Sequence, residues 1–408
     1  MIDKIISSSP KSISLIEHSK LLTTTAESLL AQHNTLAEIN NIKRELIKKN
    51  DESLIFILLA LKIAKSKIFI NRIKRPLSIS VVFAVYKEHN RIRKISEHPH
   101  GEDFLNIKME QLKWLFADNK NIDWQLIVVD DGCPENSGKI AQSIIDKNNF
   151  ADKAQVLYLK DAIKQKLPPV QGLKSVDDSK KGGAIAYGMW HSVQQNSSKR
   201  HIVIYTDADL STHLGQIGLL ANPILNQGKL AVTGSRRSWN SIVIKKENRN
   251  KRGKLFIYLW KRLLPCLHNI VDTQCGFKGF RANIISDLTK DLIERQFAFD
   301  IELLLKTNLI KHNGVDKIGI AWIDSEEEST TKELQSYLPM LKAIVKMYKK
   351  YCIKNPNSDE FAAFVESLTD EEFNNILDNV PKPILKKKPF KFTKYDKVKV
   401  ADLVEHKN

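Results

Sequence analysis

The sequence predicts an α/β fold in which a mainly parallel sheet is covered by helices on both faces. From Leu77 onward, short β-rich runs alternate with helical stretches, and this alternation is typical of such sheets. Polar and acidic residues stand directly after several runs, where ligands bind in folds of this kind. The runs that we expect to be strands are Ile79–Val85, Gln125–Val129, Ala154–Leu159, Ile202–Thr206, Leu230–Thr233 and Val315–Ala321.

The composition is that of a soluble globular protein and bounds the possible functions. Of the 408 residues, 27% are charged and 42% are hydrophobic, and the net charge of +17 favours anionic partners such as nucleic acid, an anionic membrane surface or phosphorylated ligands. The four cysteines show no paired spacing, as expected in a reduced cytosolic compartment. No signal peptide is visible, and the longest apolar run, Leu54–Leu61, is too short to span a bilayer. We therefore expect a cytoplasmic protein whose contact with membranes, if any, is peripheral.

The chain divides into three predicted regions. Residues 1–75 form an N-terminal helical region, residues 76–354 form the domain that contains the sheet, and residues 355–408 form a C-terminal helical, lysine-rich extension. The second boundary rests on the linker-like stretch Asn355–Ser358.

The most informative motif is Asp207-Ala208-Asp209, which follows the apolar run His201–Thr206. Two carboxylates one residue apart on an extended chain point the same way and repel each other unless a cation lies between them. Carboxylate oxygens suit Mg²⁺ or Mn²⁺, and Mg²⁺ is usually completed by substrate phosphates. The alternative is a turn in which Asp209 caps a helix.

Acidic residues also follow the first two predicted strands. Asp130 and Asp131 precede Gly132, and a carboxylate there accepts hydrogen bonds from a base or a ribose; the alternative is an Asp-Gly turn. After the first strand, Val85 and Tyr86 lead to Glu88, which faces a nucleotide or begins a helix.

Basic and mixed motifs complete the set of candidates. Lys181 and Gly182 precede a helical stretch, as in anion sites at helix N-termini. Arg236 ends a further strand and either meets a diphosphate or belongs to a solvated basic turn. The stretch Phe299–Glu302 opens an apolar helix, where its acidic residues either serve the helix dipole or act as a base.

Taken in order, these motifs resemble the family 2 glycosyltransferases with the GT-A fold, and within them the dolichyl-phosphate β-glucosyltransferase-like branch. The resemblance covers about residues 76–351, and its most specific part is the D-T-Q-C-G-F-K string. The matching segments are Val85–Glu88, Val129–Gly132, Lys181–Ala184, Tyr205–Asp209, Gly234–Arg236, Asp272–Lys278 and Phe299–Glu302.

The resemblance implies a role for each group of residues. Asp131 holds the nucleoside with Asp130 beside it, Asp207 and Asp209 bind the metal and the diphosphate, and Asp272 and Gln274 lie near the donor sugar. Asp300 is the candidate base, and Glu302 flanks the acceptor. We thus expect a donor side of Val85, Tyr86, Glu88, Asp130, Asp131, Lys181, Gly182, Asp207, Ala208, Asp209 and Arg236, a catalytic set of Asp300, Asp272 and Gln274, and an acceptor side of Phe299, Glu302 and Trp322.

The implied reaction is an inverting, metal-dependent transfer of a hexose, glucose by resemblance, from a nucleotide sugar such as UDP-glucose to a polyprenyl phosphate or other lipid. Three adjacent glutamates, Glu326–Glu328, would repel a phosphate acceptor, because both carry negative charge. The basic stretch Lys245–Arg262 runs into an aromatic, aliphatic helix, which suits an interfacial helix on anionic lipid; the alternative is a basic loop followed by a core helix.

Three rival functions stay open at this point. The first rival is a glycosyltransferase that acts on a protein or soluble small-molecule acceptor. The second is a non-catalytic protein that kept this fold for a scaffold role. A basic nucleic-acid-binding protein is the third, although none of the common nucleic-acid-binding signatures is present. The sequence does not indicate an oligomeric state.

Overall fold

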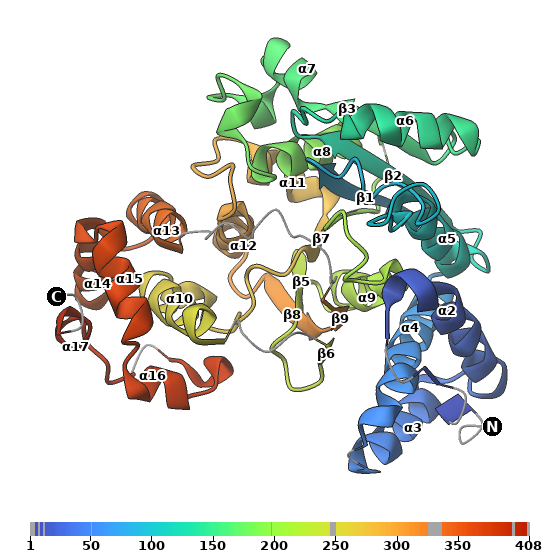
Figure 1. The fold of residues 1–408 in the computed structure, drawn as a ribbon, viewed down its shortest axis with the longest axis horizontal. Helices are drawn as coiled ribbons and strands as arrows, with labels where there is room; N and C mark the ends of the chain where they lie inside the picture. Colours follow the sequence, from blue (N-terminus) through green and yellow to red (C-terminus); the bar gives the residue numbers. More distant parts are fainter. Residues whose placement is uncertain are drawn as a thin grey trace.

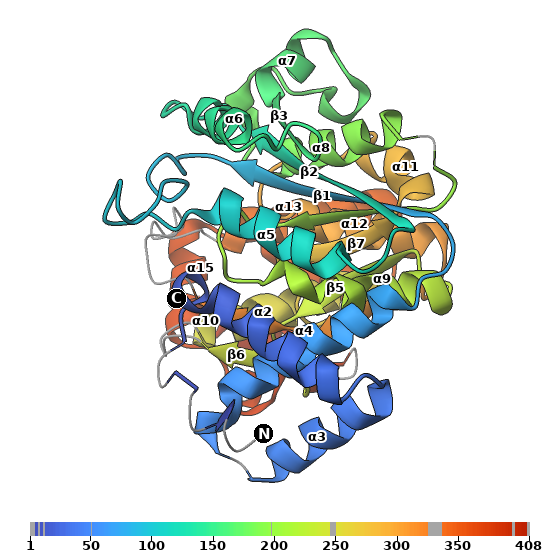
Figure 2. The same cartoon turned by 90° about the vertical axis from the view of Figure 1, so that its right-hand side faces the viewer.

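A computed structural model describes residues 5–6, 9–10, 13–49, 51–196, 198–244, 250–324, 337–393 and 396–405. Its centre is a seven-stranded sheet with the strand order β3-β2-β1-β4-β7-β5-β8 (Figures 1 and 2). Neighbouring strands are parallel, except that β7 runs antiparallel to both β4 and β5. The predicted α/β fold with a mainly parallel sheet is therefore confirmed. The strands are β1 (Leu77–Val85), β2 (Ile122–Asp130), β3 (Ala154–Tyr158), β4 (His201–Thr206), β5 (Ala231–Ser235), β7 (Phe277–Arg281) and β8 (Val315–Gly319).

Alternate residues of the sheet supply two separate apolar cores. Val82 of β1 packs into one core, whereas Val81 and Phe83 pack into the other, as the two-residue period of a strand requires. Both faces are therefore sealed by helices. The first core includes side chains of α8 (Gly182–Gln194), α10 (Asn250–Leu263), α11 (Ile285–Thr289), α12 (Phe299–Ile310) and α13 (Tyr337–Tyr351), and the second those of α5 (Phe104–Phe116), α6 (Ser137–Lys147) and α9 (Ile217–Asn226).

The N-terminal helices α2 (Leu15–Gln32), α3 (Leu36–Lys49) and α4 (Ile55–Asn71) belong to the second core. α4 is largely apolar and packs against α2, α3, α5 and α9 (Figure 2). Its buried Lys62 donates to the carbonyl of Gly319 over 2.5 Å, at the end of β8. These helices therefore pack directly on the sheet domain; the domain boundary at residue 75 stays a prediction.

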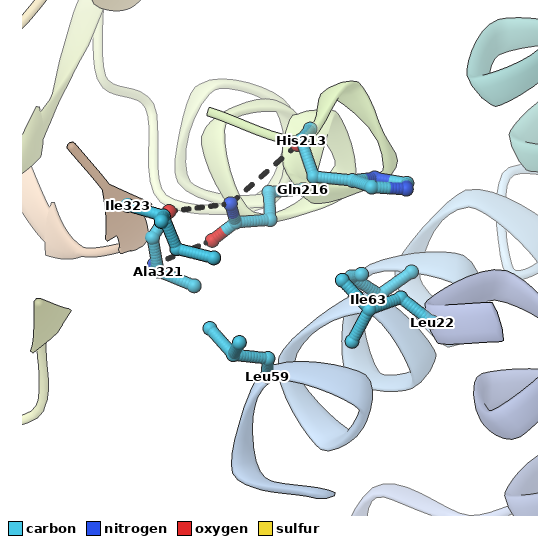
Figure 3. Close-up of a pocket in the computed structure, with 7 residues that line it drawn as sticks. All are labelled: Leu22, Leu59, Ile63, His213, Gln216, Ala321 and Ile323. Carbon is cyan, nitrogen blue, oxygen red and sulfur yellow. Dashed lines mark hydrogen bonds between the residues drawn. The ribbon is translucent and has the colours of Figure 1, made fainter. Parts of the chain in front are cut away.

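A second, two-stranded parallel sheet joins β6 (Ile242–Ile244) and β9 (Ala321–Ile323). The Gln216 side chain fixes it to the start of α9, because it accepts from the amide of Ala321 over 2.7 Å and donates to that residue's carbonyl over 2.9 Å (Figure 3). The space between Gln216, His213 and the apolar side chains of α2 and α4 is a cavity of about 10 Å³. That volume holds at most one water molecule.

The prediction that the Lys245–Arg262 stretch forms an interfacial helix is wrong for the described part of it, α10. Phe256 is 3% exposed and Trp260 is fully buried, because α10 packs against α13 and the C-terminal helices. Its basic residues also bond internally: Lys261 donates to the carbonyl of His268 over 2.8 Å, and Arg262 donates to the Tyr258 hydroxyl. The core-helix alternative is what the structure shows. The covering helices are α14 (Pro356–Ser367), α15 (Asp370–Asp378) and α16 (Lys382–Lys386).

Residues 245–249 and the glutamates Glu326–Glu328 lie outside the described residues. Within the described ranges, no helix is both long enough and apolar enough to cross a bilayer.

We predict that Leu259→Ala in α10 lowers the free energy of unfolding by about 2–5 kcal/mol, the usual cost of truncating a buried leucine. Urea denaturation measures this change. The matched control is Ile353→Ala, at a side chain that is 92% exposed, which should change stability by less than about 0.5 kcal/mol. Equal, small effects of the two substitutions would contradict a core position for α10.

Candidate active site

The candidate residues gather where β1, β2 and β4 end, and the segment 272–278 closes over the end of β4. The centre of this region is Asp207, whose amide donates to the carbonyl of Gly276 over 3.1 Å. Its carboxylate is in direct contact with the Lys181 ammonium. Burial raises the pKa of Asp207, but the charges of Lys181 and Arg236 outweigh it and hold the pKa below its usual value. Asp207 is therefore an anion held among cations.

Gly276 allows the Asp207 carboxylate to lie where it does. A Cβ atom on this glycine would stand 2.1 Å from Asp207 Oδ1, so any side chain there would force the carboxylate to move. The glycine in the D-T-Q-C-G-F-K string is thus required by close approach to the carboxylate.

Asp131 positions the loop that carries Lys181. Its two carboxylate oxygens accept from the Ser179 hydroxyl over 2.7 Å and from the amide of Lys181 over 2.6 Å. Burial raises the pKa of Asp131 to about 6, despite these hydrogen bonds. Asp131 and Lys181 were both predicted to bind the donor, and the structure brings them together in one hydrogen-bonded unit.

Asp130 is engaged differently. Its carboxylate accepts from the amides of Gly132 and Cys133, both over 2.9 Å, and from the amide of Gly138 over 2.8 Å. These bonds close the turn between β2 and α6, which is the Asp-Gly turn alternative. Asp130 thus orders the turn that presents its neighbour Asp131.

Arg236 and Asp272 form a bidentate ion pair at the end of β5. The guanidinium donates to both carboxylate oxygens, over 2.9 Å from Nε and 2.8 Å from Nη2, and it stacks over the ring of Trp322 with its Cζ 5.3 Å from the centroid. Burial raises the pKa of Asp272, but Arg236 lowers it to about 2 overall. The Arg236 guanidinium thus brings together three residues that were predicted for the site, namely Arg236, Asp272 and Trp322.

Gln274 contributes an unused donor. Its Nε2 atom is buried and has no hydrogen-bond partner among the residues that the structure describes. A buried amide without an acceptor costs free energy, and native proteins rarely leave one unless a ligand or water takes it up.

A buried ion pair lies behind Asp207. Lys278 Nζ donates to Asp300 Oδ1 over 2.5 Å and to the carbonyl of Cys275 over 2.6 Å, and it stands 5.1 Å from the centroid of the Tyr205 ring. Burial lowers the pKa of Lys278 to about 7 and raises the pKa of Asp300. Both pKa shifts disfavour a charge on either group alone. The pair is therefore neutral as a whole, with one ionisable proton shared between Nζ and Oδ1.

The Glu302 carboxylate stabilises the local structure. It accepts from the amides of Ile293 and Glu294, both over 2.8 Å, and from the Tyr351 hydroxyl over 2.8 Å. All of these partners lie in the loop before α12 or in α13. Phe299, also predicted on the acceptor side, is 1% exposed and packs against the Tyr205 ring.

Sequence reasoning missed an ionic cluster beside Asp209. Arg91 donates to Glu102 over 2.8 Å and to Glu88 over 3.1 Å, and its Nη2 lies 3.8 Å from Asp209 Oδ2. The buried Lys108 of α5 donates to the carbonyl of Asp209 over 2.7 Å. Burial raises the pKa of Glu88 to about 7, and the charges of Asp209 and Glu102 add to this shift. The spacing of Glu88 and Arg91 was the one signal in the sequence, because the other members come from distant segments.

The remaining predicted residues line the same edge. Val85 is buried at the end of β1, and its carbonyl accepts from the amide of Asp131 over 3.1 Å, while Tyr86 is 43% exposed. Ala208 is 8% exposed between the two aspartates. Gly182 starts α8 where a Cβ would stand 2.7 Å from the carbonyl of Arg295.

Comparison with known proteins adds relatives but no matching family model. A dolichyl-phosphate beta-glucosyltransferase of Trichomonas vaginalis is 25% identical over 263 residues, which is 62% of this chain and 68% of the relative. The human protein of that name is 26% identical over 61% of this chain and 68% of its own length, and the Drosophila melanogaster protein is 24% identical over 68% and 76%.

Among solved structures, glucosyl-3-phosphoglycerate synthase of Mycobacterium tuberculosis aligns with a TM-score of 0.45 and 16% identity, over 72% of this chain and 85% of its own.

The sheet with its acidic strand ends, together with these relatives, defines a glycosyltransferase with the GT-A fold. Within that class, the chain resembles the dolichyl-phosphate β-glucosyltransferase branch of family 2, as its motifs predicted.

We predict that Gly276→Ala displaces the Asp207 carboxylate and lowers glycosyl transfer by at least about 100-fold, because a methyl group cannot share its position. The same substitution at Gly279, whose Cβ would meet the flexible Ile224 side chain at 3.3 Å, is the control. Initial rates with circular dichroism as a folding check measure the effect. Equal activity of the two variants would mean that the position of Asp207 is unimportant.

Proposed function

We propose that this protein transfers glucose from UDP-glucose to a polyprenyl phosphate, with a divalent cation and inversion at the anomeric carbon. The observation that carries the proposal is the convergence of three separate motifs on Asp207. Lys181 contacts its carboxylate, Gly276 leaves room for it, and Asp209 follows it at the end of β4. The names of the relatives support the glucosyl group and the polyprenyl-phosphate acceptor, and the family resemblance supports UDP-glucose as the donor.

On the donor side, the proposal assigns the nucleoside to Asp131 and the diphosphate to the cations around Asp207. Asp131 is 5% exposed and retains acceptor capacity, since a carboxylate has about four lone-pair sites and two are occupied here. Lys181 reaches the diphosphate from the start of α8, where backbone amides and the helix dipole favour anions. The unpartnered Gln274 amide donates to a hydroxyl of the sugar.

The residues present fit a divalent cation that the nucleotide helps to hold. Across the described ranges, no three His, Cys, Asp or Glu side chains are arranged to bind a metal by themselves. Mg²⁺ in nucleotide enzymes is commonly held by one or two carboxylates plus substrate phosphates, and Asp207 and Asp209 provide two. A bound cation would stabilise the charge that develops on the departing diphosphate.

On the acceptor side, the Lys278–Asp300 pair favours a phosphate over a hydroxyl. A hydroxyl acceptor must lose a proton to a base, whereas a phosphate is already an anion. Because the buried pair holds one proton and is neutral as a whole, a second proton would leave a net positive charge on two buried side chains. Asp300 is thus a poor base, and the Lys181 ammonium instead provides positive charge toward an anionic acceptor.

The proposed reaction is a single displacement at the anomeric carbon. An oxygen of the acceptor phosphate forms a bond to the anomeric carbon from the face opposite the diphosphate. The bond from that carbon to the diphosphate oxygen breaks, and UDP departs with the electron pair. Lys181 and Arg236 stabilise the growing negative charge.

The rival acceptors are separated by one experiment. Purified protein is given radiolabelled UDP-glucose and Mn²⁺ with a polyprenyl phosphate, the matching polyprenol, or a soluble hydroxyl acceptor. We expect label in the organic phase with the polyprenyl phosphate alone. Transfer to the polyprenol or soluble acceptor would support the rival, and binding of UDP-glucose without any transfer would support a non-catalytic protein.

We predict that Asp209→Asn lowers kcat by at least about 100-fold and removes the effect of the cation on donor binding, since several kcal/mol of charge stabilisation depend on the metal. The amide keeps the oxygen that accepts from Ser211, so the turn should survive. Calorimetry of UDP-glucose binding with Mn²⁺ and with EDTA measures the second effect. Equal wild-type affinity under the two conditions would exclude the metal role.

We predict that UDP-glucose binding weakens below about pH 6. The carboxylate of Asp131 must be ionised to accept from a base N–H, and burial raises its pKa to about 6. Affinity should therefore rise as pH rises through this value, by about tenfold from about pH 5 to about pH 7.5. In Asp131→Asn the profile should be flat and the affinity low throughout. A wild-type profile without this step would place the nucleoside elsewhere.

A further inference from the structure

A cavity of about 330 Å³ lies at the edge of the sheet opposite the candidate active site. It is bounded by the end of α4, by the connection from α4 to β1, by α9 and by Arg200 just before β4. In Figure 2 the β1 arrow points left toward the candidate site, whereas the end of α4 lies to the right. Because β1 alone spans about 26 Å, the cavity and the candidate site are separate.

The charges around this cavity are all of one sign. Arg72, Lys74, Arg75 and Arg200 line it, and none of its lining residues is acidic. In the part of the chain that the structure describes, none of the four takes part in an ion pair. Most cations around the candidate active site, by contrast, have a carboxylate partner.

Arg72, Lys74 and Arg75 are exposed, so solvent screens their mutual repulsion, but four like charges around one cavity still favour a bound anion. The carboxyl end of a helix attracts cations, and this accounts for Arg72 at the end of α4. Arg200 comes from a different segment and is only partly exposed, and its Nη1 donates to the carbonyl of Pro76 over 3.5 Å.

The cavity is also preformed and partly apolar. α4 and α9 touch through Ser66 and Gly218, where a Cβ on the glycine would lie 2.2 Å from the Ser66 carbonyl oxygen. This close packing fixes one wall. Phe69, Ile73 and Leu225 add apolar surface, while Asn222 and Asn226 are hydrogen bonded to each other over 2.9 Å. A ligand for this cavity therefore combines a strong anion with a small apolar part.

We propose that this cavity is a second binding site, for a phosphate ester. Arginine forks bind phosphate oxygens bidentately, and the apolar wall takes the ester's carbon skeleton. The ester is either a soluble metabolite or the headgroup of an anionic phospholipid, and both present the same chemistry to the cavity. This proposal does not depend on the proposed transferase activity.

The test uses the full-length chain with glycerol 3-phosphate as the soluble probe, and phosphatidylcholine vesicles with or without phosphatidic acid as the lipid probe. Hydrogen exchange locates binding, which should protect residues 69–76 and 217–226. The double variant Arg75→Gln/Arg200→Gln should weaken binding by about tenfold or more, because two charge-assisted contacts are lost. The control Lys139→Gln/Lys147→Gln removes the same charge from exposed positions of α6 and should bind like the wild type.

Binding of glycerol 3-phosphate that the double variant loses would support a soluble ester as the ligand. Binding only to vesicles with phosphatidic acid, again lost in the double variant, would support the phospholipid. Absence of binding to both probes, protection confined to other segments, or an equal loss in the control variant would overturn the proposal.

Discussion

The candidate site depends on the Asp207 carboxylate, which lies partly buried among cations at the end of β4. A carboxylate in that position is costly unless charged partners surround it, and Lys181, Arg236 and Lys278 supply those charges. Each requirement then constrains another segment. Lys181 is positioned by Asp131, and Gly276 must lack a side chain. The motifs lie far apart in the sequence, but each of them contributes to holding the Asp207 carboxylate.

The same balance of charge organises the rest of the edge. Arg236 is held by Asp272, and Lys278 is held by Asp300, so two cations with flexible side chains keep fixed positions without a ligand. A site arranged in this way needs little reorganisation when a diphosphate arrives, and this is how preorganised charges lower a barrier. Glu302 and Asp130 contribute indirectly, because their carboxylates accept hydrogen bonds from backbone amides and so shape the surrounding loops.

Much of this could be predicted from the sequence, because strand ends in a parallel sheet meet at one edge. The β-branched runs located β1 to β5 and β8, and the paired aspartates marked the edge. β7 was missed, because Phe277–Arg281 carries Lys278, Gly279 and Arg281 where a strand usually carries apolar residues. The Arg91–Glu102–Lys108 cluster was missed because side chains from a loop and a helix meet only in the folded chain. α10 was misjudged, because its amphipathic pattern does not reveal that the C-terminal helices cover it.

The central claim is that Asp207 and its partners form the donor diphosphate site, and a crystal structure with UDP and Mn²⁺ tests it most directly. The account predicts a metal ion that Asp207 and Asp209 would hold beside the diphosphate, with the Lys181 ammonium on a phosphate oxygen and the Asp131 carboxylate against the uracil. UDP bound at another place, or at this edge with the Asp207–Lys181 contact unchanged and no metal beside it, would contradict the account.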